Sequence, residues 1–156
     1  MKSINKPGDN LGGGLKLYAI PPALVSALSA GSMTVSSTTD VIEMYFTPGT
    51  LNFDQEHVPA TKDRAGGYHA LKITAFTPKL SNDAEIILEQ MRNRSYVVVF
   101  MDGNEQFWAC GTALQPMRFA YTSGTGNDTS GLNGYSITFE RRTSNAPMLI
   151  SDPFTE

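Results

Sequence analysis

Hydrophobic residues form an unbroken run at one point of this chain. Every position from Tyr96 to Met101 is apolar, a polar turn follows at Asp102–Asn104, and a largely apolar return segment spans 106–111. An Asp-Gly pair between two apolar runs is a strong hairpin signal, because glycine adopts positive φ without steric cost. A half-exposed strand would alternate apolar and polar positions. The first arm is therefore predicted to be covered on both faces.

A helical pattern precedes this hairpin. Apolar residues recur there at the spacing of one helix face: Ala84, Ile87, Leu88 and Met91. The polar run Ser81–Asp83 just before them supplies side-chain oxygens that accept hydrogen bonds from the unpaired amides of a first helical turn. The sequence therefore predicts one helix, which begins at this run and ends near Asn93.

Alternation of apolar and polar positions predicts most of the other strands, expected at residues 15–20, 40–46, 51–58, 68–77, 116–122 and 135–140. Residues 23–28 are compatible with a helical turn or an irregular edge, and residues 29–39 are expected to be a loop. The chain has no βαβ rhythm and no internal repeat. The predicted fold class is α+β, mainly β: an antiparallel β-sandwich or barrel of about eight strands with one flanking α-helix.

Length and composition are typical of one globular domain. The chain has 156 residues, of which 40% are hydrophobic and 17% charged. We expect an extended N-terminal arm (1–14), a single β-rich domain (15–142) and a C-terminal tail (143–156). No apolar run approaches the roughly 20 residues that span a bilayer, so no membrane partner is expected.

The apolar residues of the tail have no evident place in a core built from these strands. We therefore expect them to contact a partner. Together with two residues near the start, they form the set of candidate subunit contacts: Leu11, Leu15, Pro147, Met148, Leu149, Ile150 and Phe154.

Residue types that could bind a metal ion do not come together in the sequence. His57 and His69 could be combined with Asp54, Glu56 and Asp63 into a metal site, but these residues lie across two strands and a loop. Metal ligands need a rigid and closely spaced arrangement, so solvated strand edges are the preferred interpretation, and neither metal nor cofactor is expected.

Catalytic and ligand-binding patterns are equally weak. The glycine-rich loop around Gly124 leads into a strand, whereas a phosphate cradle needs a helix after the loop. No nucleophile elbow accompanies the serines, so no catalytic residue is assigned and no enzyme is expected. The single cysteine, Cys110, is expected to be buried and inert. Four aromatic residues could form a stacking platform, although their alternation fits a core better: Phe107, Trp108, Tyr121 and Tyr135.

Several stretches carry a family resemblance. They are LYAIP (17–21), DVIEMYF (40–46), YVVVFMDG (96–103), Gly111, the strand at 116–121, and GLNGYSITF (131–139). Through them the chain from Leu15 onward resembles small virion structural proteins of phages and prophages of the Bacteroidetes, including crAss-like phages. The resemblance implies a neck or tail component, similar to tail-tube, tail-terminator and connector-ring proteins. It implies no particular functional residues, since such proteins work by shape and oligomerisation.

The expected function follows from this resemblance. It is a homo-oligomeric ring or tube of roughly six or twelve copies in the virion neck or tail, assembled in the cytoplasm of the host bacterium. Other neck, tail or portal-associated proteins are the expected partners, and DNA passes through without specific binding. A net charge of −3 suits such a channel, because phosphate binding grows with neutralising Lys and Arg. The alternative is a carbohydrate-binding β-sandwich on a phage or cell surface, which predicts a monomer with an exposed aromatic platform.

Overall fold

The computed structural model describes residues 12–63, 66–127 and 133–154. Most of these residues lie in antiparallel strands, and they include a single α-helix, so the α+β, mainly β class is confirmed. The number of strands is eleven among the described residues, three more than expected. The Leu11 candidate and nearly all of the expected N-terminal arm lie outside the described residues.

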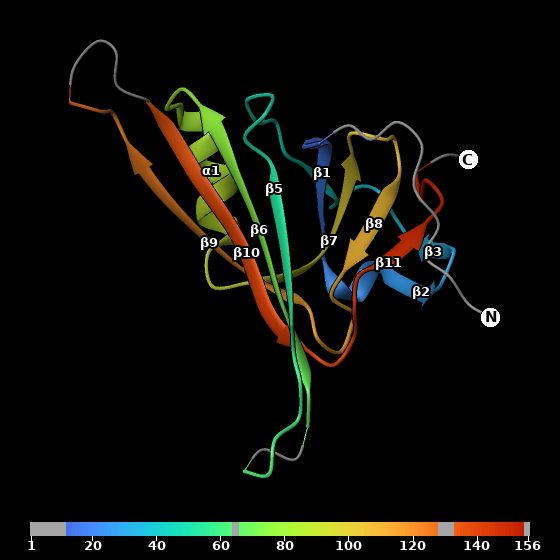
Figure 1. The fold of residues 1–156 in the computed structure, drawn as a ribbon. Helices are drawn as coiled ribbons and strands as arrows, with labels where there is room; N and C mark the ends of the chain where they lie inside the picture. The colour runs from blue at the N-terminus through green and yellow to red at the C-terminus, as the bar shows by residue number, and fades with distance from the viewer. Residues whose placement is uncertain (1–11, 64–65, 128–132, 155–156) are drawn as a thin grey trace.

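Nine of the strands form one continuous sheet that folds into two layers (Figure 1). One layer runs β4-β1-β7-β8-β11: β1 (Gly14–Ile20), β4 (Ile42–Glu43), β7 (Ser95–Asp102), β8 (Phe107–Cys110) and β11 (Met148–Ile150). The other runs β5-β6-β10-β9: β5 (Asn52–Val58), β6 (Tyr68–Pro78), β9 (Met117–Gly124) and β10 (Gly134–Thr143).

The two layers are joined at two corners. At the first, the start of β7 pairs with β9 through Ser95↔Arg118 and Tyr96↔Met117. At the second, the chain after β4 crosses from one layer to the other, because the Met44 amide donates to Leu17 and the Thr47 amide donates to Phe76. This crossing explains why the strand expected at 40–46 shortens to Ile42–Glu43. Its apolar side chains Met44 and Phe46 remain in the core as the alternation predicted.

The predicted central hairpin is confirmed. β7 pairs with β8 from Val98↔Cys110 to Met101↔Phe107. Tyr96 to Phe100 are all buried, which confirms that both faces of β7 are covered. The turn differs in one detail, since the left-handed residue is Glu105 (φ 62°) rather than Gly103. The Asp102 carboxylate holds this turn by accepting from the Asn104 amide (2.9 Å) and the Gln106 amide (3.0 Å).

The helix α1 (Asn82–Met91) starts as predicted. Ser81 caps it, since its hydroxyl oxygen accepts from the Ala84 amide at 3.2 Å. Leu88 and Met91 are buried, but Ile87, which was expected on the same face, is 44% exposed. The buried stripe is therefore narrower than the sequence pattern suggested.

A second core lies on the opposite side of the five-stranded layer. It contains Ile20, Met33, Val97, Val99, Ala109 and Ile150. A hairpin of β2 (Val25–Ser29) and β3 (Ser32–Val35) contributes to this core and follows a 3₁₀ turn at Pro22–Leu24. The expectation of a loop throughout 29–39 was therefore wrong, because β3 lies within that range.

The C-terminal tail also belongs to this second core. β11 pairs with β8, Ile150 is buried, and the Phe154 ring lies 4.4 Å from the Tyr18 ring. The expectation that these side chains lack a place in the core was wrong. Both faces of β7 were predicted to be covered, but the sequence pattern did not assign the C-terminal tail or the segment at 29–39 to the second face.

Candidate assembly surfaces

The hairpin of β5 and β6 projects from the body of the protein (Figure 1). β10 supports β6 only as far as Thr143↔His69, whereas the pairing of β5 with β6 continues to Val58↔Tyr68. Beyond this pair the chain runs through a polar loop that includes Lys62 and Asp63, both exposed. We call residues 56–69 the projecting hairpin. Its tip extends past the other strands of its layer.

Side-chain contacts order the root of the projecting hairpin. The His57 and His69 rings lie 5.0 Å apart between centroids, and the Gln55 amide lies 3.0 Å from Nδ1 of His69. On the other face, the Arg142 guanidinium lies 5.4 Å from the Tyr68 ring centroid. The hairpin therefore leaves the body in a direction set by specific contacts.

An apolar patch lies at the edge of the other layer. Leu15 is 53% exposed and Tyr45 is 71% exposed. Both line a hollow of about 420 Å³ over β1 and β4, together with Met44, Phe46 and Pro48. Exposed aromatic and aliphatic side chains beside a hollow are typical of protein contacts. We call Leu15 and Tyr45 the edge patch.

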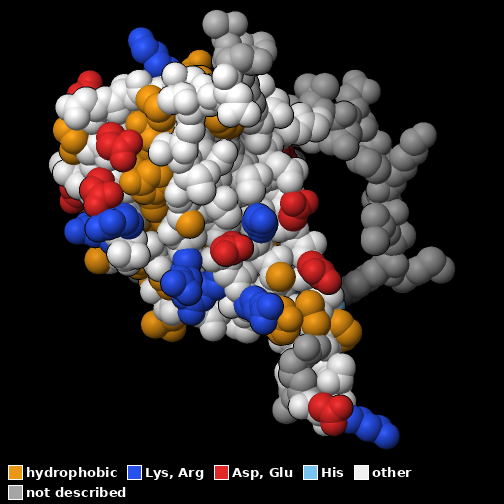
Figure 2. Space-filling view, turned by 90° about the vertical axis from the view of Figure 1, so that its left-hand side faces the viewer, with side chains coloured by type: hydrophobic (Ala, Val, Ile, Leu, Met, Phe, Trp, Pro, Cys, Tyr) orange, Lys and Arg blue, Asp and Glu red, His pale blue; other side chains and the backbone are white. Residues whose placement is uncertain are grey.

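A second apolar region lies along α1. Ile86 and Ile87 are about half exposed, and Ile87 lines a groove of about 890 Å³ between the helix and residues 39–43. Figure 2 shows hydrophobic side chains gathered in a band beside acidic and basic ones on the face it presents. This region adds a further surface on which another chain could pack.

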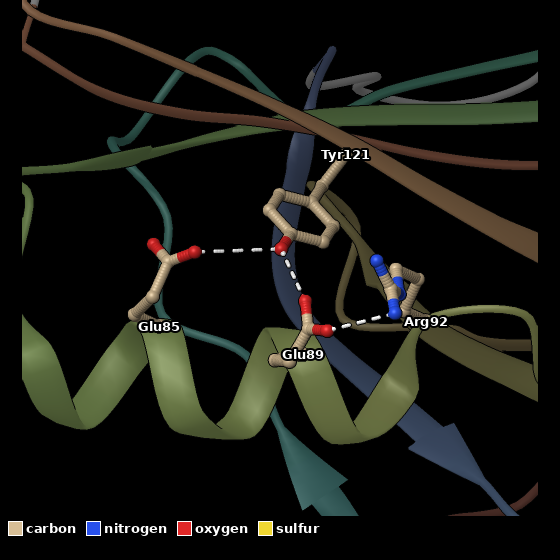
Figure 3. Close-up of polar contacts among 4 residues, drawn as sticks. All are labelled: Glu85, Glu89, Arg92 and Tyr121. Carbon is tan, nitrogen blue, oxygen red and sulfur yellow. Dashed lines mark hydrogen bonds and ion pairs between the residues drawn. The ribbon is translucent and has the colours of Figure 1, made fainter.

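Polar contacts fix α1 against β9 and β10 (Figure 3). The Tyr121 hydroxyl lies 3.4 Å from Glu85 and 3.2 Å from Glu89, and Arg92 pairs with Glu89 at 3.0 Å. Tyr135 donates to Glu85 at 2.9 Å. Burial, followed by the neighbouring carboxylates, raises the pKa of both tyrosines. This cluster holds helix to sheet, and its carboxylates are occupied by those contacts.

The outer face of the four-stranded layer carries charges of alternating sign. Cross-strand register places Arg118 opposite Glu140, Glu140 opposite Lys72, and Lys72 opposite Asp54. Opposite charges in directly paired positions stabilise a sheet modestly. A face with both signs interspersed does not present the single-sign basic field that nucleic-acid binding requires.

The single cysteine and the candidate metal ligands can be placed in the fold. Cys110 is fully buried, and burial raises the pKa of its thiol, as expected for an inert cysteine. Among the described residues, no group of three or more His, Cys, Asp or Glu side chains could hold a metal ion. His57 and His69, however, come together across two strands, which the sequence interpretation did not anticipate.

The four aromatic residues considered as a platform do not share one surface, since Tyr121 and Tyr135 lie together at 6.3 Å between ring centroids whereas Phe107 and Trp108 lie on β8. Tyr135 is buried in the first core, Trp108 packs against the same core, and Phe107 packs against the second core. Phe107 and Trp108 are neighbours on β8, so their side chains point to opposite faces. They therefore do not form one exposed stacking surface.

The candidate subunit contacts fall into two groups. Ile150 is buried and Met148 and Phe154 pack on the second core, whereas Leu15 and Leu149 (45%) remain exposed. Pro147 lines a hollow near Trp108. Tyr45 is also exposed and was not named among these candidates. The alternation pattern already placed Tyr45 opposite the buried face of its strand, which was the available signal.

Within the described residues, no helix has the length and apolar character needed to cross a membrane. Comparison with protein-family models, with curated proteins and with solved structures found no match.

Proposed function

We propose that this protein is a structural subunit of a phage particle, and that copies of it form a closed ring or tube in the neck or tail through which DNA passes. The projecting hairpin is the observation that carries the proposal. A two-stranded extension with a polar tip adds little to the core of its own chain, but it gives a subunit reach toward a neighbour. The sequence resemblance to virion proteins points to the same class.

The positions of the surfaces favour head-to-tail contact. Figure 1 places the tip of the projecting hairpin and the first residues of β1, which carry Leu15 of the edge patch, at opposite ends of the molecule. A contact between two different surfaces repeats from copy to copy, and it closes into a ring when the rotation between copies divides a full turn. The hairpin of one copy against the edge patch of the next is such a contact.

Charge agrees with a passage for DNA rather than a binding site for it. The net charge is −3, and the outer face of the four-stranded layer alternates in sign. Affinity for DNA rises with the number of phosphates that Lys and Arg neutralise. A lumen built from such surfaces would let DNA slide.

The direct test is the mass of the purified protein in solution by light scattering, with negative-stain microscopy of the same sample. We expect one closed species of defined stoichiometry. In a shortened variant, residues 59–67 are replaced by Asn-Gly. This turn suits the Val58↔Tyr68 pair, because two-residue loops join directly paired strand ends. The variant should retain the thermal midpoint and become monomeric.

A matched pair of point variants tests the edge patch. Tyr45→Ser should weaken assembly, whereas Leu114→Ser should not, although Leu114 is the more exposed of the two at 92%. A monomeric wild-type protein at high concentration would refute the proposal. If the shortened variant assembled fully, the projecting hairpin would not be the contact that joins the copies.

Copy number in virions tests the biological setting. Mass spectrometry of particles, scaled to the major capsid protein, should give roughly six or twelve copies for a single ring, and many tens for a stacked tube. Absence from particles would contradict a virion role.

One observation favours carbohydrate binding as a second candidate. A hollow of about 310 Å³ lies beside Trp108 and is lined also by Phe53, Asn52 and Gln55. Aromatic rings with nearby amides suit sugars, although the Asp102 carboxylate there already accepts from Trp108 Nε1 at 2.9 Å. A glycan that raises the thermal midpoint of a monomeric protein, and fails to do so in Asn52→Ala, would favour this candidate.

A further inference from the structure

Two histidines face each other at the root of the projecting hairpin. His57 on β5 and His69 on β6 occupy directly paired positions, so both side chains lie on the same face of the sheet. Their ring centroids are 5.0 Å apart, with an angle of 45° between the planes. The two imidazoles are thus held side by side by backbone pairing on both strands.

We propose that His57 and His69 form a two-histidine site for a divalent transition-metal ion, with Zn²⁺ as the reference ion. Zinc binds imidazole nitrogen at about 2.0–2.1 Å with tetrahedral angles. Two rings bound to one such ion have centres roughly 5 Å apart by this geometry. The observed centroid spacing of 5.0 Å matches this separation.

Gln55 supplies the outer contact that a metal-binding histidine needs. Its amide lies 3.0 Å from Nδ1 of His69. The amide atom at this distance is the nitrogen, Nε2. In the metal-bound form a half-turn of the terminal amide would bring Oε1 to the ring, where it accepts the Nδ1 proton and leaves the Nε2 lone pair of His69 for the metal. Such outer partners fix the tautomer and the orientation of metal-binding histidines.

The His57 side chain is exposed, so an ion can reach its ring from solvent. Gly67 lies next to the ring, and a Cβ at this position would come within 3.6 Å of Nε2 of His57. The ring contacts His69, but no hydrogen bond to His57 is found within the described part of the chain. The absence of a side chain at Gly67 leaves room for the ion and for water on its remaining positions.

The donor set selects the class of metal. Imidazole favours Zn²⁺, Ni²⁺ and Cu²⁺, whereas Mg²⁺ and Ca²⁺ prefer oxygen donors. The acidic residues Asp54 and Glu56 alternate to the other face of β5, so they do not join the histidines. The site is therefore a pair of imidazoles completed by water, and not the five-residue set that the sequence analysis considered and set aside.

A bound ion would bridge β5 and β6 where the projecting hairpin leaves the body. The bridge would hold the two strands together at that point and fix the direction of the tip. The site itself does not depend on assembly, because both ligands come from one chain. Failure of the ring proposal would leave it standing, and the reverse also holds.

Calorimetric titration of the full chain with Zn²⁺ tests the site, with Mg²⁺ as the control ion. We expect one Zn²⁺ per chain and no heat from Mg²⁺. His57→Ala and His69→Ala should each weaken binding by at least about tenfold, and Gln55→Ala by about tenfold, as for the loss of an outer partner. Glu56→Gln should bind like the wild-type protein.

The thermal midpoint supplies a second measurement. Zn²⁺ should raise it in the wild-type protein and not in either histidine variant, since a ligand that binds only the folded state stabilises it. Equal midpoints of all variants in EDTA establish that they fold, and His69→Gln replaces His69→Ala if the latter does not. Absence of Zn²⁺ binding, or binding that persists without either histidine, overturns the proposal.

Discussion

The two layers of the sheet are buried in different ways. In the five-stranded layer, neighbouring residues of β7 such as Val98 and Val99 are both fully buried, because a core lies on each face. In the four-stranded layer, β10 alternates between buried residues such as Phe139 and exposed residues such as Ser136 and Glu140. The five-stranded layer is covered on both faces, whereas the four-stranded layer has one face on the core and one face in solvent.

This difference assigns the stability of the fold and the contact with partners to different parts of the sheet. A strand buried on both faces has no side chain left for a partner, so the five-stranded layer holds the fold together. The four-stranded layer keeps a polar face and continues into the projecting hairpin. The residues available for a partner therefore lie on the second layer, at the edges of the first and along α1.

Truncation of a buried aromatic residue in β10 should have the largest effect. Phe139→Ala removes a ring that packs on Tyr96 and Phe119, and it should lower the free energy of unfolding by about 3–5 kcal/mol. Ser136→Ala, on the exposed face of the same strand, should change it by less than about 0.5 kcal/mol. Urea denaturation measures both. Equal losses would mean that the outer face of this layer is covered.

The same test in β7 should show no contrast between the faces. Val98→Ala and Val99→Ala each remove two buried methyl groups, from the first and second core respectively. Each should cost about 2 kcal/mol, from the transfer free energy of the lost carbons plus a cavity. If Val99→Ala cost nothing in the same urea measurement, the second core would not contribute to stability.

A pair of glycines in register tests the close packing at one end of the four-stranded layer. Gly134 pairs with Gly124. A Cβ on Gly134 would overlap the Thr77 carbonyl oxygen, whereas a Cβ on Gly124 meets no atom within 4 Å. Gly134→Ala should therefore lower the thermal midpoint by the equivalent of about 1–3 kcal/mol, and Gly124→Ala should leave it unchanged or raised. The opposite ranking would contradict the described packing.

The smallest effect is expected at the contact between α1 and the sheet, and only at high pH. Burial raises the pKa of Tyr135, so the folded state holds this proton more tightly than the unfolded state. The resulting stability is complete below about pH 10 and is lost as pH rises through the folded-state pKa. Tyr135→Phe should therefore lose less stability than the wild-type protein between pH 9 and 11 by urea denaturation.

Tyr45→Phe is the control for this measurement, since Tyr45 is exposed. Removal of its hydroxyl should leave the alkaline loss of stability as it is in the wild-type protein. An identical alkaline profile for Tyr135→Phe and wild type would mean that Tyr135 does not contribute.

Local signals predicted the elements that local chemistry determines. The Ser81 cap, the Asp102–Asn104 turn and the alternation in β10 all lie within a few residues of the structure they specify. The β2–β3 hairpin and β11 were missed, because each forms by covering the second core. Whether that face of β7 is covered depends on residues distant in sequence.

The candidate site was predictable in part. Leu15 was named as a contact from its position near the start, and it is exposed, although its partner remains a prediction. The pairing of His57 with His69 could have been found. Both residues lie equally far from Asp63, at the centre of the loop between two predicted strands, and a symmetric hairpin pairs such positions.

The position of β7 between β1 and β8 also bears on how fast the chain folds. Ala19 pairs with Val98, so the first strand of the described chain must wait for a partner that lies far along the sequence. Closure of long loops before any contact compensates for the lost entropy slows folding, and β-rich domains of this kind fold in about milliseconds to seconds. The β7–β8 hairpin forms from neighbouring residues, so it can appear first and serve as the template on which β1 docks.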